Sequence, residues 1–331
     1  MRVALQIFVH EHPVQIPLTT RILDSFVRIT ESRFVTTHQV LVACVLVLCI
    51  GIGTSYAAEN TLPGDLLYSV KTGINERLQG SFAVSAASKA RWTTEIANRR
   101  LTEAEELAAT GRLTPVASAE LESALDDTVQ NFDSQVETLA DEATIADAQS
   151  VLEVSLNAHE TVLASIGSAS ATVEQNLLPI VSKVREHADR VTRARFEAEV
   201  RLTAKNDSGI RSAALSKKKS AQEQVISAKK NIRKNSEEKA TAPVRNVAEE
   251  AAWDVTMGDN DVEKGNWGRA FGAYQAAIRT VLEDKTGEDA RDRLKAKLGL
   301  ELDATSTNPR TSASNSEDGE VHDATSVVQE D

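Results

Sequence analysis

The sequence predicts an all-α protein: one N-terminal transmembrane helix, then an antiparallel helical bundle outside the cytoplasm, then a disordered acidic tail. Three observations predict this class. Aromatic residues make up only 4% of the 331 residues, which is poor for a β-sandwich and suits helical hairpins with thin cores. A long apolar run lies near the N-terminus. Beyond that run, apolar residues recur at steps of three and four, which is the period of an amphipathic helix.

Residues 1–33 are expected to form a short cytoplasmic segment. Within residues 18–33, apolar residues at helical spacing lie among arginines. This pattern predicts a short helix that either lies along the inner membrane surface or has no contact with lipid. His10 and His12 have the spacing of a metal-binding pair on a strand, but the sequence supplies no further ligands close by. We therefore predict no metal site there.

Residues 34–58 are predicted to form the transmembrane helix. The strictly apolar core, residues 40–53, is shorter than the ~20 residues that a span needs, so its flanks must supply the rest. One other interpretation stays open, a signal peptide cut after Ala57, where Ser55 and Ala57 satisfy the small-x-small rule. A lipoprotein anchored at Cys44 is disfavoured, because the apolar run continues for nine residues past that cysteine.

The charges around the apolar run predict its orientation. Arg28 and Arg33 precede the run, and positive residues stay on the cytoplasmic side. The N-terminus is therefore expected inside and the bulk of the chain outside. Cys44 and Cys49, the two cysteines of the chain, both lie within the run, so the outer part is expected to fold without a disulfide.

A Leu-Pro-Gly-Asp turn is predicted to open the helical region. Pro63 presets φ at the second position of the turn, and Gly64 supplies positive φ at the third. Asp65 is expected to cap the following helix, where its charge suits the N-terminus. Leu62 is expected to pack back onto the first turn of that helix, near Tyr68.

The turn and the residues after it resemble a family of single-pass bacterial envelope proteins whose module of unknown function opens with Leu-Pro-Gly-Asp-x-Leu-Tyr-x-Val-Lys. The resemblance covers about residues 57–165 and departs at Ser69, where the family commonly has proline. It implies a helical domain behind a single membrane span, and it implies no chemistry because the role of the family is unknown. The matching signature residues are Leu62, Pro63, Gly64, Asp65, Tyr68 and Lys71, and a second stretch supplies Arg99, Arg100, Leu101, Glu103 and Ala104.

Residues 59–170 are predicted to form this helical domain of unknown function. Gly111 is a stop signal for its first long helical stretch. Residues 115–143 carry the clearest apolar stripe of the chain, with the steps of three and four that are also typical of a coiled coil. This stripe must face other helices, which predicts an antiparallel bundle with short loops. Its members are Leu121, Leu125, Val129, Phe132, Val136, Leu139 and Ala143.

Residues 171–245 are predicted to form long helices, of which the second is basic. Residues 205–245 hold 11 Lys+Arg against 4 Asp+Glu and no aromatic residue, so stacking on nucleic acid is not supported. The default interpretation is a solvated helix, and the sharper one is a helix that binds lipid headgroups or wall polymers. His187 is interpreted as a boundary histidine beside Glu186 and Asp189, not as a ligand or proton switch. The candidate anion-binding residues are Lys217, Lys218, Lys219, Lys229, Lys230, Arg233 and Lys234.

Residues 246–300 are predicted to form a C-terminal helical hairpin. A weak similarity to a tetratricopeptide hairpin lies near residues 250–285, but one such repeat cannot bury its own face. We therefore expect the hairpin to dock on the basic helix or on the helix before it, with a peptide-binding groove as the alternative. Residues 301–331 are polar and acidic and are expected to be disordered. Four aromatic residues mark the hairpin: Trp253, Trp267, Phe271 and Tyr274.

The sequence contains no recognisable nucleophile–base pair, phosphate loop, zinc pattern or pair of buried carboxylates. We therefore predict no enzyme, no cofactor, no metal, no small-molecule substrate and no nucleic-acid partner. The expected function is a tether in the bacterial cytoplasmic membrane that contacts an unidentified protein or an envelope polymer. Two alternatives stay open: a transmembrane regulator that couples an outer sensing domain to residues 1–33, and a soluble binder released after Ala57.

Overall fold

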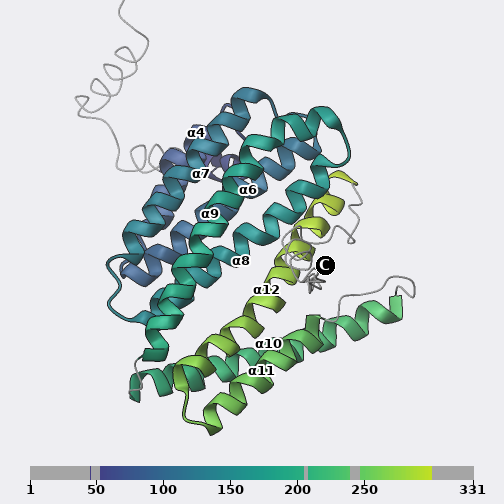
Figure 1. The fold of residues 1–331 in the computed structure, drawn as a ribbon. Coiled ribbons are helices and arrows are strands. Elements are labelled where there is room, and N and C mark those ends of the chain that lie inside the picture. Colours follow the sequence, from purple (N-terminus) through teal and green to yellow (C-terminus); the bar gives the residue numbers. More distant parts are fainter. Residues whose placement is uncertain (1–44, 46–52, 205–207, 239–246, 300–331) are drawn as a thin grey trace, which may run out of the picture. The chain divides into compact units, whose positions relative to one another are not determined.

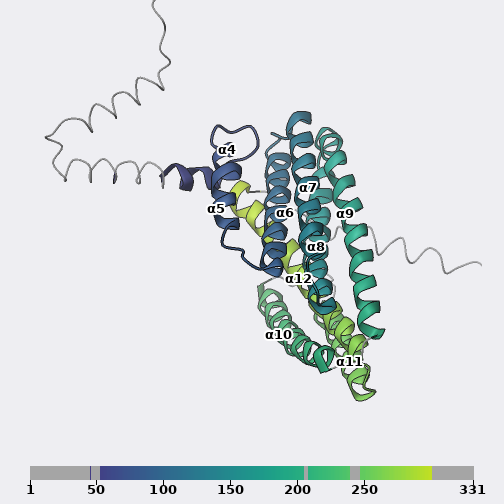
Figure 2. The same cartoon turned by 90° about the vertical axis from the view of Figure 1, so that its left-hand side faces the viewer.

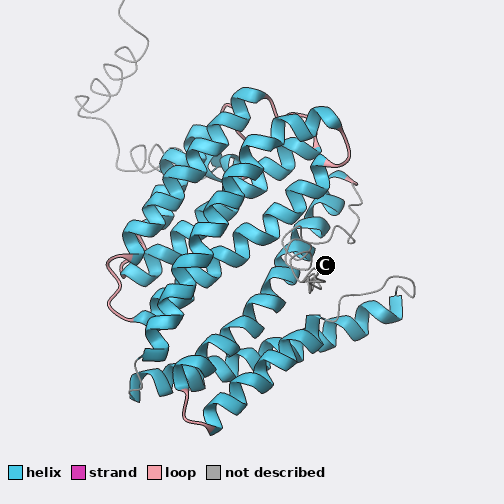
Figure 3. Ribbon diagram, in the orientation of Figure 1, coloured by secondary structure: helices cyan, strands magenta, loops and turns pink. Residues whose placement is uncertain are grey.

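The computed structural model describes residues 45, 53–204, 208–238 and 247–299. It divides the chain into two units, Met1–Asn60 and Thr61–Asp331. The described residues form helices and their connections, with no strand among them, which confirms the predicted all-α class (Figure 3).

The predicted transmembrane helix of residues 34–58 lies outside the described residues, apart from residue 45 and residues 53–58. In the part of the chain that the structure describes, no helix is both long and apolar enough to cross a bilayer. The His10–His12 pair and the predicted tail of residues 301–331 also lie outside the described residues.

The second unit begins with short helical pieces and continues with long helices (Figure 1). The short pieces are α4 (Tyr68–Val70), the π-helical turn η1 (Lys71–Asn75) and α5 (Glu76–Gly80). The long helices are α6 (Ala86–Ala109), α7 (Pro115–Val136), α8 (Glu142–Gly167), α9 (Ala171–Ala204), α10 (Ser208–Glu238), α11 (Val247–Glu263) and α12 (Trp267–Leu298).

Polar side chains start several of the long helices. Ser85 forms a capping box with Ser88 at the start of α6, which satisfies backbone donors that have no partner within the helix. The hydroxyl of Thr114 and the carboxylate of Asp141 accept backbone N–H bonds at the starts of α7 and α8. Gly111 has a φ of +67° in the loop after α6, which confirms its predicted role as a stop signal.

The first hydrophobic core lies between α6, α7, α8 and α9. Each of these helices contributes buried leucine, valine or alanine side chains, and the α12 residues Ala290 and Leu294 complete the core. The predicted apolar stripe of α7 is confirmed, because its leucines, valines and phenylalanine are nearly inaccessible to solvent. Leu139 is partly buried against this core, whereas Ala143 belongs to the second core. Short loops join these four helices, as predicted for a bundle.

The second core lies between α10, α11 and α12. Phe271 and Tyr274 of α12 fill it, and alanines of α10 and α11 pack around them. The hairpin of α11 and α12 thus docks on the basic helix α10, as expected. The ends of α8 and α9 also contribute, through Ala146 and Leu202. Helices α8, α9 and α12 are therefore shared by both cores, and Figure 2 shows α12 running from the α10–α11 end of the unit toward α5.

Two ion pairs hold the far half of α12 against α6. Arg293 donates to the carboxylate of Glu105 at 2.8 Å, and Lys297 donates to Glu106 at 2.7 Å. The other oxygen of Glu105 lies 2.6 Å from Nδ1 of His159 on α8. Glu105 is fully buried and His159 nearly so, so this contact fixes three helices at one point.

The near half of α12 depends on a glycine. A Cβ at Gly268 would lie 2.5 Å from the carbonyl oxygen of Leu202 on α9, and that backbone cannot turn aside. Gly268→Ala is therefore expected to destabilise the fold by about 1–3 kcal/mol. Gly272→Ala on the same helix is the matched control. Its Cβ would lie 3.8 Å from its nearest neighbour, the carboxylate of Glu199, so the gain in helix propensity should stabilise the protein by about 0.5–1 kcal/mol.

For both variants, unfolding of the full chain by urea in detergent is monitored by circular dichroism. Equal effects of the two substitutions would contradict the close approach of α12 to α9.

Candidate functional site

The signature turn is held by a carboxylate. The N–H of Asp65 donates to the carbonyl of Leu62 at 2.9 Å, and Gly64 has a φ of +92°, as predicted for this position. The side chain of Asp65 turns back and accepts the N–H of Leu62 at 2.9 Å. The predicted helix cap is wrong: α4 starts after Leu67, with no side-chain cap. The carboxylate is drawn instead to the nearer N–H of its own turn and to Arg112, 2.7 Å away.

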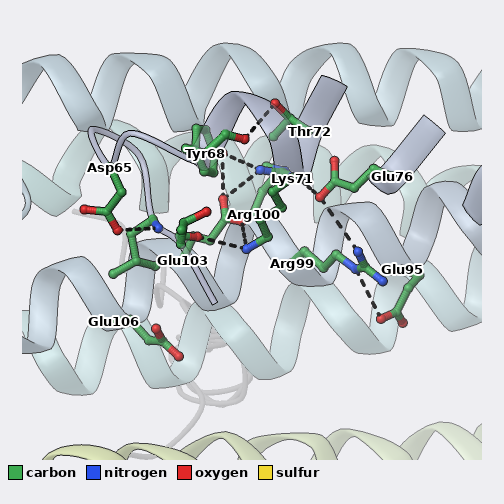
Figure 4. A network of polar contacts seen from close by, with 12 residues as sticks. Asp65, Tyr68, Lys71, Thr72, Glu76, Glu95, Arg99, Arg100, Glu103 and Glu106 are labelled. Carbon is green, nitrogen blue, oxygen red and sulfur yellow. Dashed lines mark hydrogen bonds and ion pairs between the residues drawn. The ribbon is translucent and has the colours of Figure 1, made fainter. Parts of the chain in front are cut away.

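Tyr68 and Lys71 point from this turn toward α6 (Figure 4). The hydroxyl of Tyr68 donates to Oε2 of Glu103 at 2.8 Å. The ammonium of Lys71 lies 2.7 Å from Oε1 of Glu103 and donates to the carbonyl of Thr61 at 3.1 Å. All three side chains are buried. The two oxygens of one glutamate therefore hold two signature residues.

Arg100 lies at the centre of these contacts. Its guanidinium donates to the Tyr68 hydroxyl, to Oε2 of Glu103 at 2.8 Å and to Oε1 of Glu76. Arg99 lies further out, where it donates to Gln79 at 2.8 Å. We call the following six residues the signature network: Tyr68, Lys71, Glu76, Arg99, Arg100 and Glu103.

A π-helical turn allows Lys71 and Glu76 to face the same way. Residues five apart in a regular α-helix point about 140° away from each other. In η1 the N–H of Glu76 donates to the carbonyl of Lys71, and this i→i+5 bond brings the two residues closer to one face. Asn75 is buried beside them. Such turns are frequent at functional sites.

Burial and neighbouring charges shift the pKa values of three residues of the network. It raises the pKa of the Tyr68 hydroxyl far above its ordinary value, so Tyr68 stays a donor at physiological pH. Burial also raises the pKa of Glu76, against the opposing charge of Arg100. For Arg100, burial alone would lower the pKa, but Glu103, Tyr68 and Glu76 outweigh it and the pKa rises. Arg100 therefore remains a buried cation held by carboxylates.

This arrangement is suited to holding structure in place. Its donors and acceptors are turned toward one another and come from two parts of the chain, the segment 61–76 and α6. Among the described residues, no group of three or more histidine, cysteine, aspartate or glutamate side chains is arranged to hold a metal ion.

The predicted anion-binding residues of α10 do not form one site. Lys217 pairs with Asp147 of α8, and Lys218 pairs with Asp259 of α11 at 2.9 Å. Three further lysines of the set, Lys219, Lys229 and Lys230, are exposed. Arg233 and Lys234 lie in α10, but their side chains lie outside the description. Part of the positive charge of α10 thus serves to join it to its neighbours.

His187 is buried at a helix contact, which agrees with its interpretation as a boundary residue. Its partners differ from those expected: Nε2 lies 2.7 Å from Asp126 of α7, and Nδ1 lies 2.9 Å from Arg190. Burial lowers the pKa of His187, while Asp126 opposes the shift. The expected neighbours Glu186 and Asp189 are close in sequence, but the ring of His187 faces α7.

Sequence reasoning found both halves of the signature network but not their connection. The turn residues and the Arg99–Glu103 stretch were recognised as separate motifs, and Glu76 was not singled out. The available signal was Lys71 and Glu76 themselves, in a segment where Arg77 is the only other charge between residues 66 and 88.

Removing the central cation should leave two buried carboxylates without their main partner. Arg100→Met is expected to destabilise the fold by about 3–5 kcal/mol. Arg201→Met is the matched control, because Arg201 pairs with Glu142 at 2.9 Å with its side chain 47% exposed, and such pairs contribute about 0–1 kcal/mol. Thermal and urea unfolding of the full chain in detergent measure both.

A second variant separates charge from packing. Adding Glu76→Gln to Arg100→Met removes one of the stranded charges and should restore part of the loss. No restoration would mean that Arg100 acts through packing alone.

The turn should respond to pH. The backbone N–H of Leu62 and then Arg112 hold the pKa of Asp65 below its ordinary value. A carboxyl of this kind contributes stability that is present above its unfolded pKa and is lost as pH falls through its folded pKa. Asp65→Asn should therefore be less stable than the native chain at neutral pH, with the difference closing in acid. Urea midpoints at matched pH values test this, and a difference that stays constant into acid would contradict it.

Comparison with known proteins extends the resemblance carried by the motif. Residues 60–262 match the family described as Domain of unknown function (DUF5667). The matched stretch holds the turn, the signature network and the helices from α4 to α10, and it ends one residue short of the end of α11. Helix α12 lies beyond it. The comparisons with curated proteins and with solved structures find no match. Because the family match covers more than half of the 331 residues, the chain belongs to the DUF5667 family.

Proposed function

We propose that the chain is a single-pass tether of the bacterial cytoplasmic membrane. Its helical unit lies outside the cytoplasm and acts by contact with a protein or an envelope polymer, without catalysis. The observation that carries the proposal is the signature network. In this network, polar groups of the segment 61–76 bond to one another and to α6, and they fasten the segment to that helix.

The network supports a tether because it lies directly after the apolar run in the sequence. Thr61, which accepts a bond from Lys71, follows the apolar run of residues 34–58 by only three positions. A chain that leaves a membrane through a flexible linker would hold its domain loosely. Here residues 61–76 are fastened to α6 by hydrogen bonds and buried ion pairs, so no long flexible linker separates the run from the helical unit in the sequence.

The surface of α10 offers one candidate contact with the envelope. Lys219, Lys229 and Lys230 are exposed, and anionic headgroups or wall polymers carry the complementary charge. Lys217 and Lys218 are occupied by carboxylates of α8 and α11, which narrows the candidate surface to the lysines outside those pairs.

A transmembrane regulator is the second candidate, because the network fastens residues 61–76, the first part of the helical unit in the sequence, to α6. In such a regulator, a change in the outer unit would be passed along the chain to residues 1–33. Deleting residues 1–33 separates the two candidates: outer contacts found by crosslinking in intact cells should survive in a structural tether, whereas a regulatory output would be lost.

Topology is tested with single cysteines in a Cys44→Ala/Cys49→Ala background. Ser134→Cys on the exposed face of α7 should react with a membrane-impermeant maleimide in intact cells, and Ser25→Cys should react only after lysis. An N-terminal tag should remain on the membrane-bound product. A soluble product that has lost the tag would instead establish cleavage, and protection of residue 134 in intact cells would place the helical unit inside.

A further inference from the structure

The segment between the signature turn and α6 has its polar and apolar residues reversed relative to an ordinary surface helix. Four of its polar residues, Tyr68, Lys71, Asn75 and Glu76, are buried. Five of its large apolar residues are exposed, from Ile74, 57% exposed, to Leu66, 97% exposed, while Leu67 and Val70 are partly buried. Single exposed apolar residues are common and need no explanation. Here five of the fifteen exposed large apolar side chains among the described residues fall within residues 66–84: Leu66, Ile74, Leu78, Phe82 and Val84.

The fold fixes this reversed orientation. The signature network holds one side of the segment against α6. At its other end, Gly80 packs so closely on Trp92 that a Cβ there would lie 2.6 Å from the indole nitrogen. Ile74, Leu78 and Phe82 recur at four-residue steps, and all three are exposed. Figure 2 shows α4 and α5 at one side of the unit, next to α6.

Within residues 66–91, the exposed charges have one sign. Residues 66–91 contain a single acid, Glu76, which is buried within the network. The exposed charged residues of this stretch are Arg77, Lys89 and Arg91. The chain as a whole carries a net charge of −12, so a locally basic surface stands out. Exposed apolar side chains flanked by basic ones match the composition of a surface that binds at a lipid interface.

We propose that this surface, the apolar face, docks on the outer leaflet of the bilayer next to the span. The apolar face consists of Leu66, Ile74, Leu78, Phe82 and Val84, with Arg77 and Lys89 at its edge. The apolar side chains enter the boundary between headgroups and acyl chains, and the basic ones contact anionic lipid phosphates. The inference rests on the proposed single span of residues 34–58.

Chain length allows this contact. Leu66 follows the end of the apolar run by eight residues, which reach at most about 29 Å even when fully extended. The turn at residues 62–65 shortens this reach further. Leu66 is therefore restricted to a zone within about 29 Å of the end of the run.

Charge argues against a second copy of the chain as the occupant. In a two-fold symmetric dimer the same patch meets itself. Arg77, Lys89 and Arg91 would then approach their own copies with no exposed acid of residues 66–91 to offset them. Anionic lipid supplies the missing negative charge and an apolar phase together.

The test uses the full chain with Cys44→Ala/Cys49→Ala, reconstituted in phosphatidylcholine vesicles with and without phosphatidylglycerol. An environment-sensitive fluorophore is attached at Leu78→Cys or Phe82→Cys, and lipids with spin-labelled acyl chains serve as quenchers. Both positions should show blue-shifted emission and quenching several times stronger than at the control position, Ser134→Cys on α7. Quenching should increase with phosphatidylglycerol, and Arg77→Glu/Lys89→Glu should remove that increase.

A label at Val45→Cys, within the proposed span, tests the membrane tether separately from the docking of the apolar face on lipid. Strong quenching at residue 45 with none at residues 78 and 82 overturns lipid docking and leaves the tether intact. No quenching at residue 45 overturns the tether itself.

Two further outcomes bear on the occupant. Blue-shifted emission without lipid quenching, growing with the protein-to-lipid ratio, would assign the apolar face to a second copy.

Replacing Leu78 and Phe82 by serine should reduce quenching of a label at Val84→Cys, whereas Leu178→Ser, at an exposed leucine of α9, should not. Equal quenching in all three proteins would overturn the proposal.

Discussion

The buried cation Arg100 and its two carboxylates are the constraint on which the start of the helical unit depends. Taking three charges out of water is costly, and a buried ion pair often contributes little net stability compared with an apolar replacement. What such a cluster does provide is position, because each charge must find its own partner. Glu76 and Glu103 lie 27 residues apart in sequence and meet at one guanidinium. These contacts therefore fasten the irregular segment of residues 61–80 to α6 at several points.

Helix α12 connects the two hydrophobic cores, because it contributes buried residues to both. Phe271 and Tyr274 belong to the second core, while Ala290 and Leu294 belong to the first. Arg293 bonds the fully buried carboxylate of Glu105. The family match ends before this helix begins. The first core is thus completed by a part of the chain beyond the matched stretch, and the buried Glu105 would lose a cationic partner without it.

The helices could be predicted from the sequence because their signals are local. The stripe of α7 is visible as steps of three and four, and Gly111 and the Leu-Pro-Gly-Asp turn mark boundaries by their backbone chemistry alone. The network could not be predicted in the same way. Tyr68 and Glu103 are 35 residues apart, and Lys217 and Asp147 are 70 apart, so nothing in their neighbourhoods marks them as partners. Asp65 was assigned to the helix start because a cap is the common local role, but a long-range partner, Arg112, and the turn itself hold it instead.

The π-helical turn links the buried network to the exposed apolar face. It brings Lys71 and Glu76 to the same side, toward α6, and Ile74 within the turn is left outside. In a regular α-helix, Lys71 and Glu76 would point about 140° apart, and one of the two charges would leave the network. The π-helical turn thus accounts for the buried positions of Lys71 and Glu76 and for the exposure of Ile74. A surface of exposed apolar side chains with basic residues at its edge is stable in contact with a phase less polar than water, and the bilayer is the phase that we propose.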